Sequence, residues 1–366
     1  MSDNKMTAVI SADSHVMEPV DMWEKPLYAK FGDDTPRVIK NFMGRSGTWF
    51  HTGGQIMNYG GSDTSSQQIG MQAAGWDPKV RVEFQKKADI ACEVLNGTFM
   101  LLIMRHPNYA CLRACCEVFN TWLGAFIAHD RTRLRGVGML AMDDLAWSLA
   151  EVERCKKLGF DCVNIQLYAP PGQPPYRKAH WDPFWAKCQE LEMPVQLHII
   201  TGRVPDPIHF HTPAEQGDSP RTQLAMMYEV MGVLANDFIF GGILDRFPKL
   251  KVICSEFEIS WIPNFMWRLD HMQDTMSVRL PLPKLKEKAS DYMRTRVWHG
   301  MIDDAFGAET IPEIGFDRIL WGSDFPHVRS IGLDARPRLK KMFAGFSEAD
   351  RQRIISSNAA HVFNIH

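Results

Sequence analysis

Hydrophobic residues along the chain fall into short, nearly continuous runs that alternate with longer amphipathic segments. The runs are rich in Val, Ile, Leu and Cys, which is typical of strands buried on both faces. They predict strands at residues 8–16, 88–95, 135–142, 162–167, 195–200, 250–256, 297–299 and 318–324. In the segments between them, apolar residues recur at helical spacing. These segments predict helices at residues 107–129, 145–158, 183–191, 222–235, 259–270, 285–293, 302–314, 336–343 and 348–362.

Strands that alternate with helices predict a parallel sheet covered by helices. Eight such strands predict an α/β protein built as one (β/α)8 TIM barrel, a single domain over residues 1–366. A doubly wound open sheet is the alternative, but no Gly-x-Gly-x-x-Gly sequence follows the first strand. Length does not decide the matter, because 366 residues allow either two domains or one large barrel.

The segment from residue 18 to residue 81 interrupts this alternation directly after the first strand. It is rich in glycine and polar residues and has little periodicity. So long a connection is uncommon and is usually functional. We therefore predict a distorted barrel in which residues 18–81 form a lid-like insertion over the active-site mouth, with a short hairpin at residues 48–51.

Composition and charge exclude several classes of protein. With 45% hydrophobic and 23% charged residues the chain is typical of a globular protein, and its net charge of −2 offers no bulk attraction to nucleic acid or anionic membranes. No apolar run approaches the ~20 residues of a membrane span. Residues 1–6 lack the apolar region of a secretory signal. Eight cysteines without a paired Cys-x-x-Cys motif indicate reduced thiols in a cytoplasmic protein.

Candidate metal ligands stand where predicted strands end. Asp13 and His15 are two residues apart, so both side chains project to the same side of the first strand. A carboxylate and an imidazole placed in this way make half of a divalent-metal site. Three further strands end in His198, Glu256 and Asp324.

Barrel geometry would bring these strand ends together. Catalytic groups of such barrels lie at the carboxyl ends of the strands, and the first and last strands are neighbours. Asp324 is therefore expected beside Asp13 and His15, with His198 on the opposite wall. Two imidazoles and two carboxylates suit one divalent ion, and we expect zinc, with manganese or iron as alternatives.

Four segments of the chain are distinctive: ADSHVMEP at 12–19, PVQLH at 194–198, GGILDRFPKLK at 241–251 and WGSDFPH at 321–327. They resemble the amidohydrolase superfamily, in the branch that includes aminocarboxymuconate-semialdehyde decarboxylase and γ-resorcylate decarboxylase. The most specific part is Ser-Asp-Phe-Pro-His at the eighth strand. The resemblance covers nearly the whole chain and implies that Asp13, His15, His198 and Asp324 hold the metal ion.

The resemblance also implies roles for other polar residues. Arg81 matches the position from which the branch directs an arginine at the substrate carboxylate. The sixth strand of these decarboxylases often ends in a catalytic histidine, and here Glu256 takes that place, which leaves the particular reaction open. His51 and His299 are expected to bind substrate, and His209 and His211 are further candidates to line the pocket. His327 is expected to order the strand-eight loop. Glu18 is expected either to hydrogen-bond a ligand imidazole or to cap a turn.

The favoured function is non-oxidative decarboxylation of a small carboxylated aromatic or enol substrate, with Asp324 delivering the proton that replaces CO₂. Hydrolysis of an amide, ester or lactone is the alternative, in which Asp324 takes the proton from the attacking water. A hydratase and a barrel that only binds a partner also remain open. By resemblance we expect a homodimer.

Overall fold

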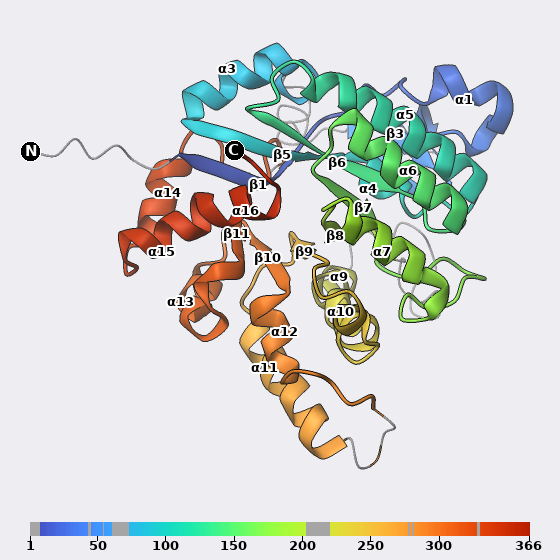
Figure 1. Cartoon of the computed structure of the whole chain (residues 1–366). Helices are drawn as coiled ribbons and strands as arrows, with labels where there is room; N and C mark the ends of the chain where they lie inside the picture. Colours follow the sequence, from blue (N-terminus) through green and yellow to red (C-terminus); the bar gives the residue numbers. More distant parts are fainter. Residues whose placement is uncertain are drawn as a thin grey trace, which may run out of the picture.

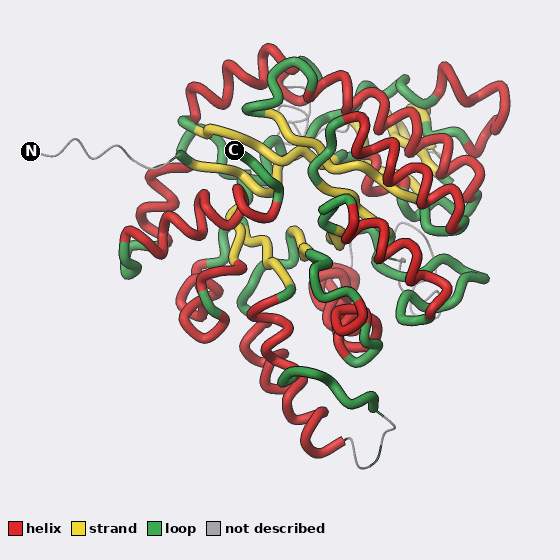
Figure 2. Tube along the Cα trace, in the orientation of Figure 1, coloured by secondary structure: helices red, strands yellow, loops and turns green. Residues whose placement is uncertain are grey.

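Eight parallel strands surround a common centre, and helices cover their outer side (Figures 1 and 2). The computed structural model describes residues 8–42, 45–53, 55–60, 73–202, 220–276, 279, 282–327 and 330–366. The strand order is β1-β5-β6-β7-β8-β9-β10-β11, which confirms the predicted (β/α)8 barrel. The strands are β1 Val9–His15, β5 Ile90–Asn96, β6 Leu134–Leu140, β7 Cys162–Ile165, β8 Val195–His198, β9 Val252–Ser255, β10 Val297–Met301 and β11 Ile319–Trp321.

The seam between the first and last strands is closed by residues that follow β11. The amide of Asp324 donates to the carbonyl oxygen of Asp13 at 2.9 Å, and the amide of His15 donates to the carbonyl oxygen of Phe325 at 2.7 Å. The amide of Ser323 donates to Oγ of Ser11 at 2.8 Å. The ring therefore closes at the level where the predicted ligands stand.

Helices begin and end where capping residues require. Asp77 caps α3 by accepting from the amides of Lys79 and Val80, and Asp144 caps α6 by accepting from the amide of Trp147. Gly159 ends α6 with φ +86°, which suits glycine. The helices are α3 Pro78–Ala88, α4 Phe99–Ile103, α5 Tyr109–Ile127, α6 Leu145–Leu158, α7 Asp182–Glu190, α9 Pro220–Val233, α10 Ile243–Arg246, α11 Ile262–His271, α12 Ala289–Thr295, α13 Ala305–Ile314, α14 Ala335–Met342, α15 Glu348–Gln352 and α16 Asn358–Val362. Within the described ranges no helix is both long and apolar enough to cross a bilayer.

The barrel interior has its own small hydrophobic core, separate from the large core between strands and helices. Inward-facing residues from seven strands meet the last helix, α16, which lies beside β1 (Figure 1). This inner core contains Ile10, Ala12, Cys92, Val94, Val137, Cys162, Ile253, Trp298, Leu320, Ala359, Val362 and Phe363. It fills the barrel away from the carboxyl ends of the strands, which leaves those ends for polar side chains.

The insertion contains more regular structure than the single hairpin predicted at residues 48–51, which lie within one strand, β3. It holds α1 (Glu24–Phe31), a short 3₁₀ turn and an antiparallel sheet in the order β2-β3-β4. The strands are β2 Arg37–Phe42, β3 Arg45–Thr52 and β4 Gln55–Gly60. Asp34 ties this insertion to the barrel, because its carboxylate accepts from Asn108 at 2.7 Å and its carbonyl oxygen lies 2.8 Å from Nε2 of His106. A lid function for residues 18–81 stays a prediction.

Candidate metal centre

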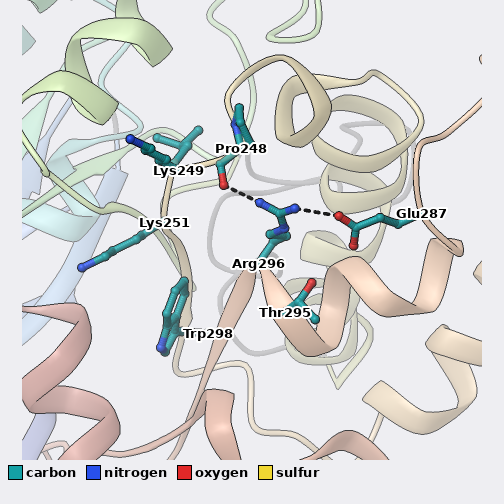
Figure 3. Close-up of a pocket in the computed structure, with 8 residues that line it drawn as sticks. Pro248, Lys249, Lys251, Glu287, Thr295, Arg296 and Trp298 are labelled. Atoms are coloured by element: carbon teal, nitrogen blue, oxygen red, sulfur yellow. Dashed lines mark hydrogen bonds and ion pairs between the residues drawn. The ribbon is translucent and has the colours of Figure 1, made fainter.

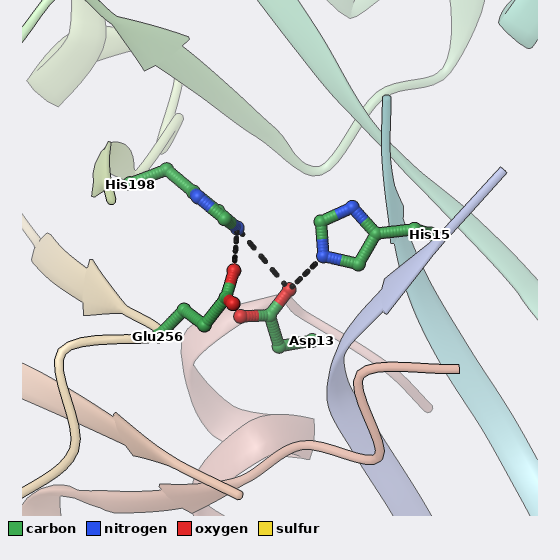
Figure 4. A group of neighbouring side chains, drawn as sticks. All are labelled: Asp13, His15, His198 and Glu256. Carbon is green, nitrogen blue, oxygen red and sulfur yellow. Dashed lines mark ion pairs between the residues drawn. The ribbon is translucent and has the colours of Figure 1, made fainter. Parts of the chain in front are cut away.

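Five polar side chains converge at the carboxyl ends of four strands. Asp13 and His15 come from β1, His198 from β8, Glu256 from the residue after β9, and Asp324 from the loop after β11. Nε2 of His15 lies 3.5 Å from Oδ1 of Asp13 and 3.3 Å from Oδ1 of Asp324. Nε2 of His198 lies 3.6 Å from both Oδ1 of Asp13 and Oε2 of Glu256 (Figure 4).

These spacings fit a single divalent ion. Ligand atoms about 2.1 Å from one ion stand roughly 3–3.5 Å apart in tetrahedral or octahedral arrangements. One donor atom from each of Asp13, His15, His198 and Glu256 lies within 4.8 Å of the others, and a second such group combines His15 and Glu256 with Asp324 and His327. The sequence placed Asp324 among the ligands, and the geometry adds Glu256 as a further donor.

Buried polar atoms without a hydrogen-bond partner support the same conclusion. Within the part of the chain that the structure describes, they include Nε2 of His15 and His198, Oδ2 of Asp13 and Oε2 of Glu256. Buried polar groups are nearly always paired, so an unpaired set that faces one point needs an explanation. A bound cation would satisfy these atoms together.

Backbone carbonyl groups orient both imidazoles. Nδ1 of His15 lies 3.0 Å from the carbonyl oxygen of Gly97, and Nδ1 of His198 lies 2.9 Å from that of Ile199. A carbonyl oxygen can only accept, so each Nδ1 carries the proton. In the neutral imidazole each Nε2 then presents its lone pair to the cluster, as a metal ligand must.

A chain of amides fixes the carboxylate of Asp13. Nδ2 of Asn96 donates to Oδ1 of Asp13 at 2.8 Å, and Nε2 of Gln196 donates to Oδ1 of Asn96 at 2.7 Å. Both amides are fully buried. Neither amide was predicted from the sequence as a functional residue, although a polar residue within a buried strand is a usable signal.

We expect Asn96→Ala to weaken metal affinity about 10–100-fold, because such supporting contacts orient the ligand. A competition titration with a chromophoric chelator measures this. Asn164→Ala is the matched control, since Asn164 is a buried strand amide on β7 that bonds the carbonyl oxygen of Ile165. Unchanged affinity in Asn96→Ala would show that Asp13 needs no such support.

Crowding of charges without a cation shifts the pKa values of these groups. Burial and the neighbouring His327 and His198 hold the pKa of His15 well below its usual value. Burial opposes protonation of His198, but Asp13 and Glu256 outweigh it and raise the pKa to about 9. Burial and the charge of Asp324 raise the pKa of Glu256 to about 8. A cation in the cluster would displace these protons.

Two of the converging carboxylates sit on strained backbone. Glu256 has φ +65° and Asp324 has φ +54°, a region that residues other than glycine rarely adopt. Such strain persists only where surrounding structure holds it, and it concentrates at functional sites. The backbone of Asp324 is held in this conformation by the hydrogen bond that its amide donates to the carbonyl oxygen of Asp13 across the seam.

His327 and Glu18 support the site from its edge. Nδ1 of His327 lies 2.6 Å from Oδ1 of Asp324, and its Nε2 lies 3.0 Å from Oγ1 of Thr98. Glu18 accepts from the amides of Thr98, Phe99 and Met100 at 3.0–3.1 Å. Glu18 therefore caps the start of α4, which is neither the predicted hydrogen bond to a ligand imidazole nor the predicted cap of a turn before Pro19.

The predicted contact between Arg81 and the substrate carboxylate does not agree with the structure. Arg81 is fully buried, and its Nε donates to Oε2 of Glu93 at 2.6 Å. All five of its N–H groups have acceptors within the protein. No donor is left for a substrate.

The predicted pocket position of His299 is also wrong. Trp298 points into the barrel core, so His299 points outward, and its Nε2 donates to the carbonyl oxygen of Met293 at 2.8 Å. Burial lowers its pKa to about 4. His51 lies on β3, with its ring 6.4 Å from that of Phe42, and its substrate contact stays a prediction. His209 and His211 lie outside the described residues.

A cavity of about 390 Å³ lies at the same end of the barrel, lined by residues that follow β5, β7 and β8. Thr201, in its wall, donates to the carbonyl oxygen of His198 at 2.8 Å. Arg105 also lines it and donates through Nε to the carbonyl oxygen of Ile200. The remaining lining residues are Met104, His106, Pro107, Tyr109, Gln166, Tyr168, Pro170, Pro171 and Gly202. Aromatic and proline walls with one cation suit a small anionic aromatic molecule.

A second cavity, of about 410 Å³, lies at the opposite end of the barrel, before β9 and β10 (Figure 3). Its central cation, Arg296, is already bonded to the carbonyl oxygen of Pro248 and to Glu287. This end of a TIM barrel contributes to stability rather than catalysis. We assign this cavity no function.

The barrel and the cluster together define a TIM-barrel enzyme that holds a divalent metal ion at the carboxyl ends of its strands. Residues 107–365 match the family model described as amidohydrolase, and the chain belongs to that family. γ-Resorcylate decarboxylase from Polaromonas sp. is 29% identical over 259 residues, which cover 67% of this chain and 75% of the relative.

Solved structures share the fold. An amidohydrolase from Mycobacterium avium subsp. paratuberculosis superimposes with a TM-score of 0.77 at 21% identity, covering 99% of both chains. A dihydroxybenzoic acid decarboxylase from Polaromonas sp., with bound manganese and the inhibitor 2-nitroresorcinol, gives a TM-score of 0.68 at 22% identity over 98% of both chains.

Proposed function

We propose that this protein is a metal-dependent, non-oxidative decarboxylase of a small carboxylated aromatic or enol substrate. The observation that carries the proposal is the cluster of Asp13, His15 and His198 with Asp324 at its edge. It joins a set of metal ligands to a carboxylate that can move a proton. The similarity to γ-resorcylate decarboxylase supports the substrate class.

The metal would be held by Asp13, His15 and His198, with Glu256 and Asp324 as the remaining donors. When bound, it supplies a Lewis acid for the substrate carboxylate and its neighbouring oxygen. We propose zinc, as the sequence suggested, with manganese as the alternative because a structural relative binds it. Metal analysis of protein purified without added metal decides between them. We also propose a homodimer, which light scattering tests.

Asp324 and His327 would supply the proton that replaces CO₂. Loss of CO₂ leaves an electron pair on the substrate carbon, and that carbon takes one proton. Oδ1 of Asp324 lies 2.6 Å from Nδ1 of His327, whose side chain is 25% exposed. Burial works against protonation of His327, yet the hydrogen bond that its Nδ1 donates to Asp324 raises its pKa. A proton can therefore pass from solvent to His327, then to Asp324 and the substrate.

The cavity lined by Arg105 would hold the substrate ring, with Arg105 at its anionic substituent. Burial lowers the pKa of Arg105 to about 10, so the guanidinium stays charged at neutral pH. The nearby carboxylate of Glu229 favours that charge. Arg105 replaces Arg81 as the proposed partner of the substrate anion.

We expect Arg105→Met to raise KM for a carboxylated substrate about tenfold or more while kcat changes little. Loss of a contact made equally in ground state and transition state gives this pattern. Arg113→Met is the control, because Arg113 pairs with Asp143. Steady-state kinetics with both variants is the measurement. An unchanged KM would remove Arg105 from substrate binding.

The decisive experiment is product analysis with a panel of carboxyl-labelled hydroxybenzoates, amides and lactones. Labelled CO₂ and the decarboxylated ring are the expected products, in amounts that depend on the divalent metal. Hydrolysis of an amide or lactone without CO₂ would replace the proposal by hydrolysis. A protein that binds no metal and turns over none of these compounds would favour a barrel that only binds a partner.

A further inference from the structure

We propose that the buried ion pair between Arg81 and Glu93 is a positioning device for the metal centre, acting on the backbone that carries His15 and Asp324. The proposal rests on the metal centre inferred above but not on which reaction occurs there. Arg81 lies on α3 and Glu93 on β5, and both side chains are fully buried. Neither is hydrogen-bonded to a side chain of the proposed ligands, and the contacts described below reach the backbone that carries them.

Arg81 spans the barrel seam with its second set of donors. Nη1 donates to the carbonyl oxygen of His15 at 2.8 Å, and Nη2 to that of Phe325 at 3.4 Å. His15 is a proposed ligand, and Phe325 directly follows Asp324. The same His15–Phe325 junction carries a seam hydrogen bond of 2.7 Å. One guanidinium thus fixes the strand end of β1 relative to the loop after β11.

We call the Arg81–Glu93 pair, together with the groups it hydrogen-bonds at the seam, the clamp. Glu93 extends this clamp through the hydroxyl groups of three serines. Its Oε1 accepts from Ser14 at 3.0 Å, and Oγ of Ser14 lies 2.9 Å from Oγ of Ser323. Oγ of Ser11 lies 2.8 Å from Ser14 and 3.1 Å from Ser323. Ser14 stands between Asp13 and His15, and Ser323 directly precedes Asp324. This serine cluster therefore braces the same two backbone segments that carry the proposed ligands.

Stability alone does not account for this arrangement. Burying a charged pair is costly, and well-packed apolar residues usually stabilise a core equally well. What apolar residues cannot supply is five donors in a fixed planar fork that reach two carbonyl groups at once. Donor atoms in the cluster must stay within a few tenths of an ångström of their positions to bind an ion well, and the clamp meets that requirement.

The test compares metal affinity and metal spectroscopy in two variants that alter the clamp. Arg81→Lys keeps the positive charge but removes the planar guanidinium with its five N–H donors. The double variant Arg81→Met with Glu93→Gln removes both charges, so no buried carboxylate is left unpaired and folding is protected. We expect both to bind Zn²⁺ about 10–100-fold more weakly in a chelator competition, and Co²⁺ loaded into them to show an altered visible absorption spectrum.

Glu151→Gln is the matched control. Glu151 is a buried carboxylate that accepts from Arg154 at 2.6 Å and from Asn120 at 2.6 Å, between α5 and α6. It should lose thermal stability while keeping the metal affinity and the Co²⁺ spectrum of the unmodified protein. Equal loss of affinity in Glu151→Gln would overturn the proposal, because the effect would then follow stability.

Each of the remaining outcomes of this experiment also supports or overturns the positioning role of the clamp. If the unmodified protein binds metal and both clamp variants bind it with unchanged affinity and spectrum, the positioning role is wrong. If the unmodified protein binds no Zn²⁺ or Co²⁺, the metal centre itself is wrong and the clamp has nothing to position. Weaker binding with an altered spectrum, confined to the clamp variants, supports the inference.

Discussion

Replacement of His198 by alanine is expected to remove most of the bound metal and nearly all activity while the barrel stays folded. His198 supplies an imidazole Nε2 that is buried, has no hydrogen-bond partner among the described residues and lies 3.6 Å from two carboxylate oxygens. With it gone, the remaining donors come from one wall and from Glu256. Metal content after dialysis, thermal unfolding and turnover measure the three parts of the prediction.

His299→Ala is the matched control for that experiment. His299 is also a buried strand histidine, but its Nε2 is bonded to the carbonyl oxygen of Met293 on the outside of the barrel. His299→Ala should therefore lower the thermal stability but bind about as much metal per chain as the unmodified protein. Full metal content in His198→Ala would remove His198 from the centre.

The second large effect is expected for Asp324→Asn under metal-saturating conditions. The substitution is nearly isosteric, so the fold and the seam hydrogen bond made by the backbone of residue 324 should persist. An amide cannot accept and deliver the proton that passes through His327. Proton transfer by a positioned group contributes about 10²–10⁴-fold to rate, so kcat should fall at least that far.

Glu256→Gln separates the two carboxylates of the site. Glu256 lies beside His198, so its loss should act mainly on metal affinity, and excess metal should restore much of the rate. Near-native turnover in Asp324→Asn, together with a metal-independent loss in Glu256→Gln, would transfer the proton-carrying role to Glu256. Rates measured across a range of metal concentrations distinguish these cases.

Hydrophobic alternation was sufficient to predict the barrel, because each strand is buried on both faces and each helix on one. The converging side chains could be predicted for a related reason. Asp13, His15, His198, Glu256 and Asp324 all lie within three residues of a strand's carboxyl end, and barrel topology brings these ends together. No knowledge of side-chain packing was needed for either step.

The errors arose where the direction of a side chain decides its role. The strand around His299 was predicted to end at that residue, but β10 continues to Met301, so residue 299 alternates outward. Arg81 lies on a helix whose buried face cannot be distinguished from a pocket wall by spacing alone, and its partner Glu93 was predicted only as part of a strand. The insertion sheet was missed because glycine and polar residues interrupt the alternation of β2 and β3.

The serine and backbone contacts across the seam join residues 312 positions apart in the chain. During synthesis on the ribosome, Asp13 and His15 emerge first and Asp324 nearly last, so a chain that ends at residue 322 contains all eight barrel strands yet lacks the contacts that close the ring. Bringing such distant segments together carries the largest loop-closure cost in the molecule. Metal binding at full affinity therefore requires synthesis at least as far as Phe325, and chains that end before residue 323 should bind Zn²⁺ more weakly in a chelator competition.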